Sequence, residues 1–369
     1  MYQRGRKSSA YRPDQWKNRW TMQNPDEMDF EEFKRHYQEV PVEEYPNNVL
    51  GAVPEPMVSV HVSTYQHADF IRDCLDGVLM QETDFPVEII IGEDESDDGT
   101  REICKEYADR HPNKIRLFLH RRENNIQIHG RPTGRFQFIY SHFMARGKYL
   151  ATCEGDDYWT DPKKLQKQVD FLEENDGCAL TYHPWVVKVE GDSPCDTDQL
   201  LQNSRKEGKV RGYPRLLTYV LKNNIDSFPK QLMEVICGDE FLLAMVKEVG
   251  DTKFVSNVRP GVYRMYEESL YSSSSPIDQR LFSFKSRLKM LEVFSNTEQE
   301  SRIRNEAVGW FHSLIRSPTG EKTKTEKIKE IFSCIRLLYR KKMILESIKH
   351  IIKKEASLVV PKYVKKVLS

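Results

Sequence analysis

The sequence is organised around the stretch Lys148-Tyr149-Leu150-Ala151-Thr152-Cys153-Glu154-Gly155-Asp156-Asp157-Tyr158-Trp159. Its first six residues predict an interior β-strand, because the run is too apolar for a surface loop and too short for an independent helix. The carboxylates of Glu154, Asp156 and Asp157 then crowd the end of that strand. Like charges repel unless a cation, hydrogen bonds or solvent relieves them, and Mg²⁺ or Mn²⁺ commonly binds one or two carboxylates plus substrate phosphates. The stretch therefore predicts a metal-diphosphate site, with an acidic turn before a helix at Asp161-Pro162 as the alternative.

The composition limits the classes of protein to consider. The 369 residues suffice for one sizeable domain with an appendage, or for two domains. Lysine plus arginine equal aspartate plus glutamate at 56 each, so we expect no nucleic-acid partner. The seven cysteines are dispersed without a Cys-x-x-Cys pair, and no signal-peptide pattern is present. No apolar run approaches the roughly 20 residues of a membrane span. We therefore expect a cytoplasmic protein with reduced thiols.

Strand-like and helix-like segments alternate ahead of the acidic stretch. The strand-like segments are 57–65, 87–92, 115–119 and 148–153, and the helix-like segments are 68–80, 98–110 and 134–145. This alternation predicts an α/β fold with a Rossmann-like, mostly parallel sheet flanked by helices. Ligands of such sheets bind at the carboxyl ends of the strands.

Polar residues stand at those strand ends. Thr64 and Tyr65 end the first strand, and Glu93 and Asp94 end the second. A carboxylate in this position accepts hydrogen bonds from a base N–H or from ribose hydroxyls, so Glu93 and Asp94 are ligand candidates. Asp97-Asp98 is expected to cap the helix that follows.

The two ends of the chain differ from this pattern. Residues 1–55 are polar and read as an N-terminal arm with one short helix near 29–40, followed by a proline-broken linker. Residues 276–369 read as a helical region with clustered lysines. Basic amphipathic helices either lie on an anionic membrane surface or cap the main domain with a solvated lysine face, and both interpretations stay open.

The order of these pieces resembles the family 2 glycosyltransferases, which have an A-type, Rossmann-like nucleotide-sugar fold. Three motifs carry the resemblance: Val58-Ser59-Val60 with Thr64-Tyr65, then Glu93-Asp94-Glu95-Ser96-Asp97-Asp98-Gly99-Thr100, then Gly147-Lys148-Tyr149 leading into the acidic stretch. Each motif is weak alone, whereas the three in this order are specific. The resemblance covers residues 56–185 well and 236–270 loosely. It implies a glycosyltransferase domain over 56–275, divided into a nucleotide-sugar half (56–160) and an acceptor half (161–275).

The resemblance also implies roles for individual residues. The implied nucleotide-sugar contacts are Thr64, Tyr65, Glu93, Asp94, Arg135, Asp156 and Arg264, and the implied ligands of Mn²⁺ or Mg²⁺ are Asp157, Asp156 and Glu154. Glu154 stands where the family usually has Asp, which leaves open which carboxylate touches the cation. Arg135 begins a helix after the Gly130–Gly134 loop, where it would reach a phosphate or remain a solvated surface arginine.

The later segments match the family less closely. Cys237-Gly238-Asp239-Glu240 resembles the Gly-Asp segment that supplies the catalytic base, with Asp239 the first choice and Glu240 the second. A carboxylate that merely begins a helix is the alternative. Val262-Tyr263-Arg264-Met265-Tyr266 resembles a Tyr-Arg-x-His segment in which Tyr266 replaces the histidine. Such a protein would hold its metal or diphosphate differently, through Arg264.

The resemblance implies a metal-dependent, inverting transfer of a sugar from a nucleoside-diphosphate sugar, UDP first, to a saccharide or lipid-linked saccharide in surface polysaccharide assembly. A lipid-linked acceptor would suit a protein on the inner face of the membrane, and a homo-oligomer stays open. A sugar-phosphate nucleotidyltransferase needs a glycine-rich basic loop after the first strand, which Ser63-Thr64-Tyr65-Gln66-His67 is not. A non-catalytic scaffold is disfavoured by the intact acidic stretch and favoured by Tyr266.

Overall fold

The computed structural model describes residues 27–190, 196–266, 275–316 and 324–343. The chain folds as two compact units, which are considered separately. The larger unit comprises residues 1–233 and 238–269, and the smaller comprises residues 234–237 and 270–369.

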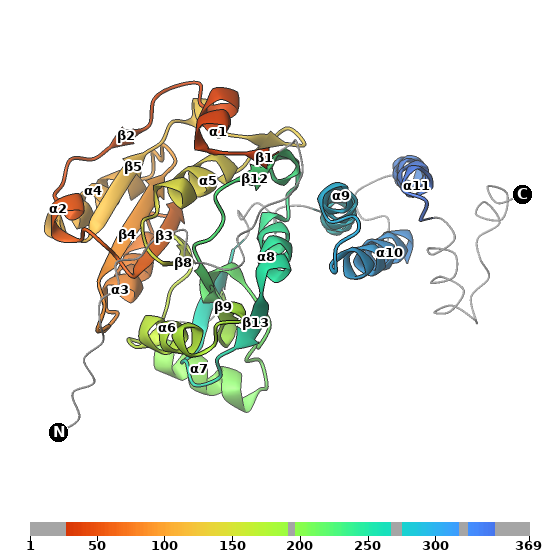
Figure 1. Cartoon of the computed structure of the whole chain (residues 1–369). Coiled ribbons are helices and arrows are strands. Elements are labelled where there is room, and N and C mark those ends of the chain that lie inside the picture. The colour runs from red at the N-terminus through yellow and green to blue at the C-terminus, as the bar shows by residue number, and fades with distance from the viewer. Residues whose placement is uncertain (1–26, 191–195, 267–274, 317–323, 344–369) are drawn as a thin grey trace, which may run out of the picture. The chain divides into compact units, whose positions relative to one another are not determined.

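The larger unit contains an eight-stranded sheet in the order β13-β9-β11-β8-β3-β4-β5-β2 (Figure 1). Its strands are β2 (Glu43–Glu44), β3 (Val58–Thr64), β4 (Val87–Glu93), β5 (Ile115–Leu119), β8 (Tyr149–Glu154), β9 (Cys178–Tyr182), β11 (Val220–Lys222) and β13 (Asp251–Phe254). Strands β8, β3, β4 and β5 are mutually parallel, while β11 runs antiparallel between β8 and β9. The α/β class, the mostly parallel sheet and the four strands predicted ahead of the acidic stretch are thereby confirmed.

Side-chain alternation along the strands explains how helices cover both faces of this sheet. Val58, Val60 and Val62 of β3 share one buried cluster with three helices, α3 (Ile71–Leu79), α4 (Thr100–Arg110) and α6 (Lys164–Glu174). His61, the residue between two of those valines, points to the other face and packs on Phe138 of α5 (Arg135–Met144), with ring centres 5.2 Å apart. Each strand is thus buried on both sides, as expected where helices flank a parallel sheet.

The register brings the polar strand ends level. Thr64 is paired with Glu93, and Ser63 with Glu154, so β3, β4 and β8 end at one edge. The chain order reverses at β3, because β4 and β5 lie on one side of it and β8 on the other. The crevice at such a switch point is where parallel sheets bind ligands.

A separate parallel ladder, which the sequence did not predict, stands beside the acidic stretch. It consists of β10 (Trp185–Val189) and β14 (Gly261–Met265). Two backbone hydrogen bonds between Tyr158 and Val262, of 3.1 and 2.9 Å, join it to the residues that follow β8. The remaining elements of this region are α7 (Thr197–Lys206), the 3-10 helix η3 (Leu216–Thr218) and α8 (Gly238–Val249).

The described part of the N-terminal arm packs on the larger unit. In α1 (Phe30–Tyr37), Phe33 is fully buried and stacks on Phe136 of α5 with ring centres 5.2 Å apart. β1 (Glu27–Met28) pairs with β12 (Phe228–Pro229), and β2 pairs with β5. Residues 27–44 therefore share contacts with the sheet domain, and a boundary at residue 55 stays a prediction. Trp16 and Trp20 lie outside the described residues.

Short elements complete the larger unit. They are α2 (Val49–Ala52), the 3-10 helix η2 (Arg122–Asn124) and a hairpin of β6 (Gln127–Ile128) and β7 (Arg131–Pro132), while the 3-10 helix η4 (Lys230–Glu234) leads out of the unit.

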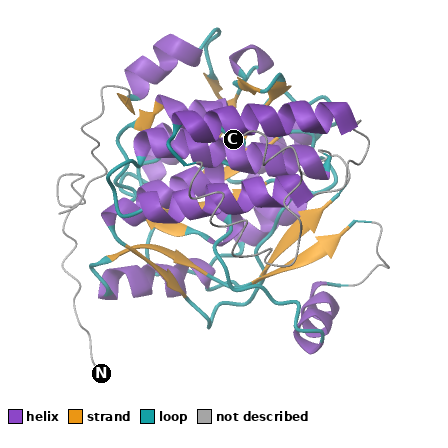
Figure 2. Cartoon of the chain, turned by 90° about the vertical axis from the view of Figure 1, so that its right-hand side faces the viewer, coloured by secondary structure: helices purple, strands orange, loops and turns teal. Residues whose placement is uncertain are grey.

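The smaller unit is helical, as the sequence predicts for this region. Its helices are α9 (Pro276–Val293), α10 (Glu300–Arg316) and α11 (Lys324–Arg340), and long helices of this unit lie side by side (Figure 2). α9 and α10 form an antiparallel pair, because Arg280 bonds to Ser313 at 3.0 Å and Arg287 pairs with Glu306 at 3.3 Å. Lys353-Lys354 and Lys365-Lys366 lie outside the described residues. No helix in the described part of the chain is both long and apolar enough to cross a bilayer.

We expect the Phe33→Ala substitution to lower the free energy of unfolding by roughly 3–5 kcal/mol, the usual cost of removing a fully buried aromatic side chain. Chemical denaturation monitored by circular dichroism measures the change. Leu50→Ala, at a position in the same arm that is 54% exposed, is the control and should change the free energy by less than about 0.5 kcal/mol. Equal, small effects of both substitutions would mean that α1 does not contribute to the domain core.

Candidate active site

The loop after β8 lies against the loop after β3 at the switch point of the sheet. Gly155 makes this approach possible: a Cβ on it would stand 2.6 Å from Oγ1 of Thr64 and 2.8 Å from Nδ1 of His67. Thr64 and His67 are themselves 3.2 Å apart through these same atoms. The carboxylates of the acidic stretch therefore face a hydroxyl and an imidazole from the neighbouring strand.

Asp157 is the buried member of the acidic stretch. Its Oδ1 accepts a hydrogen bond of 2.9 Å from the backbone N–H of Arg264, and its Oδ2 has no partner among the described residues. Burial, followed by repulsion from Asp156 and Glu154, raises the pKa of Asp157 well above its usual range. Asp157 therefore fixes β14 to the acidic loop through its buried carboxyl group.

Asp156 points away from Asp157, toward two side chains from other elements. Its Oδ2 accepts a hydrogen bond of 2.9 Å from the hydroxyl of Tyr266, which lies 3.2 Å from Nε2 of His67. Nε2 of His67 is 3.9 Å from the same carboxylate oxygen. Burial lowers the pKa of His67 despite the nearby Asp156 and Asp98, so its imidazole is neutral near pH 7. Tyr266 thus contacts the acidic stretch directly.

Arg264 braces the acidic loop and is already engaged. It is 2% exposed, and its Nη1 donates to the backbone carbonyl of Asp156 at 2.9 Å. Its other nitrogens pair with Asp73 and, at 3.2 Å, with Glu190. The guanidinium of Arg264 thus holds the backbone of Asp156 and two carboxylates of the protein itself, and its predicted contact with the nucleotide sugar stays a prediction.

Glu154 lies between the acidic loop and the start of α8. Burial and the charges of Asp156 and Asp239 raise the pKa of Glu154 to about 8, while Arg215 and Arg135 act in the opposite direction. These neighbours come from four different segments of the chain. Glu154, at the end of β8, is therefore close to the segments that contain Arg215 and Asp239.

The start of α8 brings Arg135 and Asp239 together. A Cβ on Gly238 would overlap the guanidinium of Arg135, so the absence of a side chain there leaves room for the arginine. Asp239, the next residue, is exposed, and Glu240 is half-buried. Arg135 therefore does not extend into solvent from α5 but reaches the segment expected to supply a base.

Tyr65 and Asp94 form a second corner of the site. Asp94 is buried, and its Oδ2 accepts from Arg122 at 2.6 Å and from Asn125 at 2.8 Å. Burial, partly opposed by Arg122, raises the pKa of Asp94 to about 7. The guanidinium of Arg122 also lies 4.0 Å from the ring centre of Tyr65, whose exposed fraction is 36%. Arg122 therefore joins the ends of β3 and β4.

The surroundings of Glu93 indicate a structural role instead. It is fully buried, its Oε1 accepts from the backbone N–H of Ser96 at 2.7 Å, and its Oε2 pairs with Arg101. Because both oxygens are occupied by the protein, the geometry does not support the predicted nucleotide contact. Asp98 accepts from the backbone N–H of Thr100 at 3.0 Å, but the N-cap residue of α4 is Gly99, so Asp98 lies one residue before the capping position expected for Asp97 or Asp98.

The arrangement of carboxylates decides what kind of metal site these residues fit. In the described ranges, no three His, Cys, Asp or Glu side chains are placed to hold one ion. Asp156 and Glu154 nevertheless present oxygen donors that repel one another. Such a set fits a hard cation that completes its shell with water and diphosphate oxygens, and it does not fit an all-protein cage.

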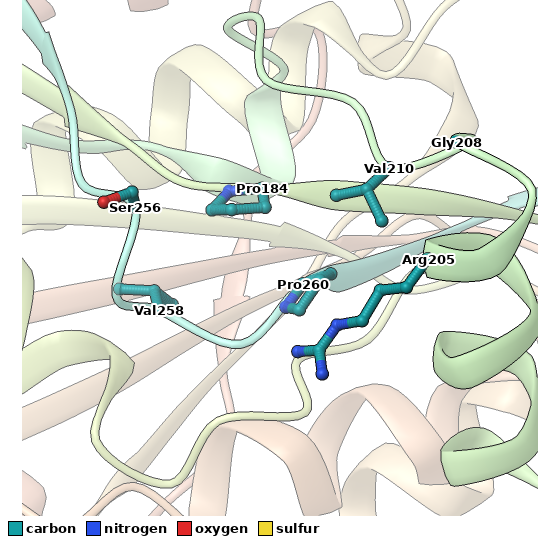
Figure 3. Close-up of a pocket in the computed structure, with 7 residues that line it drawn as sticks. All are labelled: Pro184, Arg205, Gly208, Val210, Ser256, Val258 and Pro260. Carbon is teal, nitrogen blue, oxygen red and sulfur yellow. The ribbon is translucent and has the colours of Figure 1, made fainter.

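A surface hollow of about 380 Å³ lies elsewhere in the larger unit (Figure 3). Its lining residues are Pro184, Arg205, Gly208, Val210, Ser256, Val258 and Pro260. No residue of the predicted site is among them, so the candidate site is the edge of the sheet and not this hollow.

Sequence comparison identifies the family of the segment that contains the carboxyl ends of β3, β4 and β8. The profile described as Glycosyl transferase family 2 matches residues 59–192. Residues 59–192 belong to glycosyl transferase family 2. The matched segment contains β3 to β8 and the acidic stretch, as the motifs in the sequence indicated. Arg215, Asp239 and Arg264 lie beyond it.

Curated relatives resemble the same part of the chain. An uncharacterized protein of Mycobacterium tuberculosis is 44% identical over 133 residues, which is 36% of this chain and 36% of the relative. The putative teichuronic acid biosynthesis glycosyltransferase TuaG of Bacillus subtilis is 31% identical over 173 residues, 46% of this chain and 59% of TuaG. The chain thus matches between about one third and three fifths of the length of these relatives.

Solved structures support the fold assignment. The crystal structure of TarS from S. aureus has a TM-score of 0.50 and 17% sequence identity, and the match covers 76% of this chain and 49% of TarS. The larger unit is accordingly an A-type glycosyltransferase fold.

We expect the thermal stability of the metal-free protein to fall between about pH 5 and about pH 8 because of Glu154. The folded protein retains the proton of this group up to about pH 8, whereas the unfolded chain loses it near the ordinary glutamate pKa of 4.5, so its contribution is present at low pH and is lost as the pH rises. Glu154→Gln should weaken this dependence without removing it, because Asp94 and Asp157 also have raised pKa values, and its melting temperature should fall less than that of the wild type, by roughly several degrees. Thermal melts in EDTA measure the difference.

Glu102→Gln, at an exposed position of α4, is the control and should follow the wild type across the pH range. If the melting temperatures of wild type and Glu154→Gln changed equally with pH, this result would contradict the raised pKa of Glu154.

Proposed function

We propose that this protein is a glycosyltransferase that moves a sugar, with inversion, from a nucleoside-diphosphate sugar to a saccharide acceptor. The observation that carries the proposal is the position of Glu154 and Asp156 at the switch point of an A-type fold, with Asp239 near enough for its charge to raise the pKa of Glu154. The first two carboxylates would serve a metal-diphosphate, and the third is exposed to solvent. A displacement reaction needs both.

The nucleotide would bind at the corner formed by Tyr65 and Asp94. Tyr65 offers a partly exposed ring for stacking on a base, and Asp94 offers a carboxyl group at the end of β4 that can accept from a base N–H. Thr64, next to the acidic loop, lies between this corner and the diphosphate position. A pyrimidine nucleotide such as UDP is the first choice for the donor, and Glu93 is left out of the binding set because its oxygens are occupied.

A bound Mn²⁺ or Mg²⁺ would act as a Lewis acid that offsets charge on the departing nucleoside diphosphate. Asp156 is the ligand we propose first and Glu154 the second, since the side chain of Asp156 is 17% exposed whereas Asp157 is enclosed. Asp157 instead keeps β14 and Arg264 in place beneath the loop. Tyr266 and His67 orient Asp156 from the other side.

Asp239 is the base we propose for the acceptor hydroxyl, with Glu240 the second choice. Asp239 is exposed at the first turn of α8 and takes the proton as the acceptor oxygen attacks the anomeric carbon opposite the diphosphate. A single displacement of this kind inverts the configuration at that carbon. Arg135, which lies against Gly238, offers a cation beside both the base and the leaving group.

The proposed setting is the assembly of a surface polysaccharide on a saccharide or lipid-linked saccharide acceptor. The names of the Bacillus subtilis relatives, which include TuaG and the putative glycosyltransferase EpsE, support this setting. A cytoplasmic protein whose basic C-terminal region contacts the inner face of the membrane is part of the same proposal, as is the division of residues 56–275 into a nucleotide-sugar half and an acceptor half.

We expect Asp156→Asn to abolish the Mn²⁺-dependent part of UDP binding, because it removes the charged ligand without removing volume. Asp157→Asn is the matched control. It should retain metal-dependent binding, since an amide oxygen can still accept from the backbone N–H of Arg264. Isothermal titration of UDP with and without Mn²⁺ measures both variants. The reverse outcome would make Asp157 the ligand.

We expect Asp239→Asn to leave UDP affinity unchanged and to reduce sugar transfer by roughly two orders of magnitude or more, the usual scale for loss of an acid-base group. The assay follows release of UDP from a UDP-sugar that binds, in the presence of an accepting saccharide. Undiminished turnover would leave Asp239 as a residue that only begins α8. A wild-type protein that binds UDP and never releases it from any sugar donor would favour the scaffold interpretation.

A further inference from the structure

An arginine that the sequence analysis did not single out borders the acidic loop on the side of Asp239. Arg215 immediately precedes η3, and its backbone is fixed by hydrogen bonds with Thr218, of 3.2 Å from its N–H and 2.6 Å to its carbonyl. Its guanidinium carbon lies 3.5 Å from the ring centre of Tyr263 and 5.0 Å from that of Trp185. The side chain is therefore held flat against aromatic rings.

These rings form a surface that we call the aromatic wall, made of Trp185, Tyr213 and Tyr263. Trp185 and Tyr263 lie on the same face of the β10–β14 ladder, because Trp185 is paired with Gly261, two residues before Tyr263. Trp185 is packed edge-to-face against both tyrosines, with ring centres 5.0 Å from Tyr213 and 5.9 Å from Tyr263. Its indole N–H also donates to the carbonyl of Tyr213 at 3.0 Å. Tyr213 is 51% exposed, so the wall has an open ring at its edge.

The guanidinium of Arg215 makes no hydrogen bond or ion pair with any residue that the structure describes, apart from its contacts with the rings. Arg264 and Arg122, by contrast, are each paired with carboxylates. A guanidinium carries five N–H donors and no acceptor. When its face stacks on a ring, the N–H groups at its edge can still donate two parallel hydrogen bonds to a planar acid group. Arg215 is thus a positioned cation with its donors still available.

The charges around Arg215 allow an anionic ligand. Although burial opposes it, the charges of Tyr263, Asp157 and Glu154 raise the pKa of Arg215, which stays protonated. A protonated guanidinium that stacks on two rings and pairs with no described carboxylate is able to bind an acid group.

The position of Arg215 indicates which part of a substrate it would meet. Asp156 contacts Tyr266 and His67, whereas Arg215 contacts Tyr263 and Trp185 of the β10–β14 ladder. The proposed diphosphate position belongs to the Asp156 side, and a sugar being joined belongs to the side of the ladder.

We infer that Arg215 is a specificity-determining residue that binds the carboxylate or phosphate group of an acidic saccharide, whose sugar ring lies along the aromatic wall. The inference rests on the proposed function and names its substrate class: a uronic acid or a phosphorylated sugar. The acid group is part of either the acceptor or the transferred sugar, because both are present at the reacting carbon. Exposed Tyr213 offers the apolar face on which the sugar packs.

The test uses the full chain saturated with UDP and Mn²⁺ and measures binding of methyl glucuronide, glucose 6-phosphate and neutral methyl glucoside by titration calorimetry. We expect an acidic saccharide to bind at least about tenfold more tightly than the neutral one, since hydrogen bonds to charged groups contribute about 1.5–3 kcal/mol. Arg215→Gln should remove this preference, and Arg215→Lys should restore part of it. If the preference appears only between UDP-glucuronic acid and UDP-glucose, the acid group is on the transferred sugar.

Arg110→Gln is the matched control, because Arg110 also stacks on a tyrosine, at 4.4 Å from the ring centre of Tyr107, but pairs with Glu106 on the surface of α4. It should leave every affinity unchanged. Equal binding of acidic and neutral saccharides by the wild type would overturn the inference. So would a loss of UDP affinity in Arg215→Gln, which would place the residue on the diphosphate. Failure of the wild type to bind UDP at all would instead count against the proposed function, and the saccharide titrations are therefore repeated without UDP.

Discussion

The site depends on one buried hydrogen bond, between the backbone N–H of Arg264 and the carboxyl group of Asp157. Three carboxyl groups at the end of one strand would separate if nothing held them, because each disfavours the ionisation of the others. The burial of Asp157 and its hydrogen bond to β14 fix the loop. Asp156 is then left as the member with access to a ligand, between Tyr266 and His67.

The core of the fold was predictable because its strands are buried on both faces. Segments such as 58–64 and 87–93 are apolar and β-branched, and the helices between them repeat apolar residues with helical spacing, so local pattern and final structure agree. The ladder of β10 and β14 could not be read in this way, since its two strands lie far apart in the sequence and pair outside the main sheet. The packing of Phe33 on Phe136 likewise depends on tertiary contact, which no local pattern in a polar helix announces.

The segments that form the candidate site could be predicted from the sequence, but the role of each side chain could not. Asp156 and Asp157 are adjacent in the sequence and chemically identical, yet one faces Tyr266 and the other the interior, and only the path of the backbone separates them. Glu93 resembles a ligand by position until Arg101 is seen to occupy it. Arg215 gave no local signal, because its aromatic surroundings are brought together by the pairing of distant strands.

The bond between Asp157 and Arg264 joins residues that are 107 positions apart. Contacts with such separation require a long loop to close before they give any stabilisation, so they form late during folding. On the ribosome, the strands that resemble the family would emerge and pair well before residue 264 is available. The growing chain would therefore carry a recognisable sheet whose acidic loop is restrained only after β14 has been synthesised.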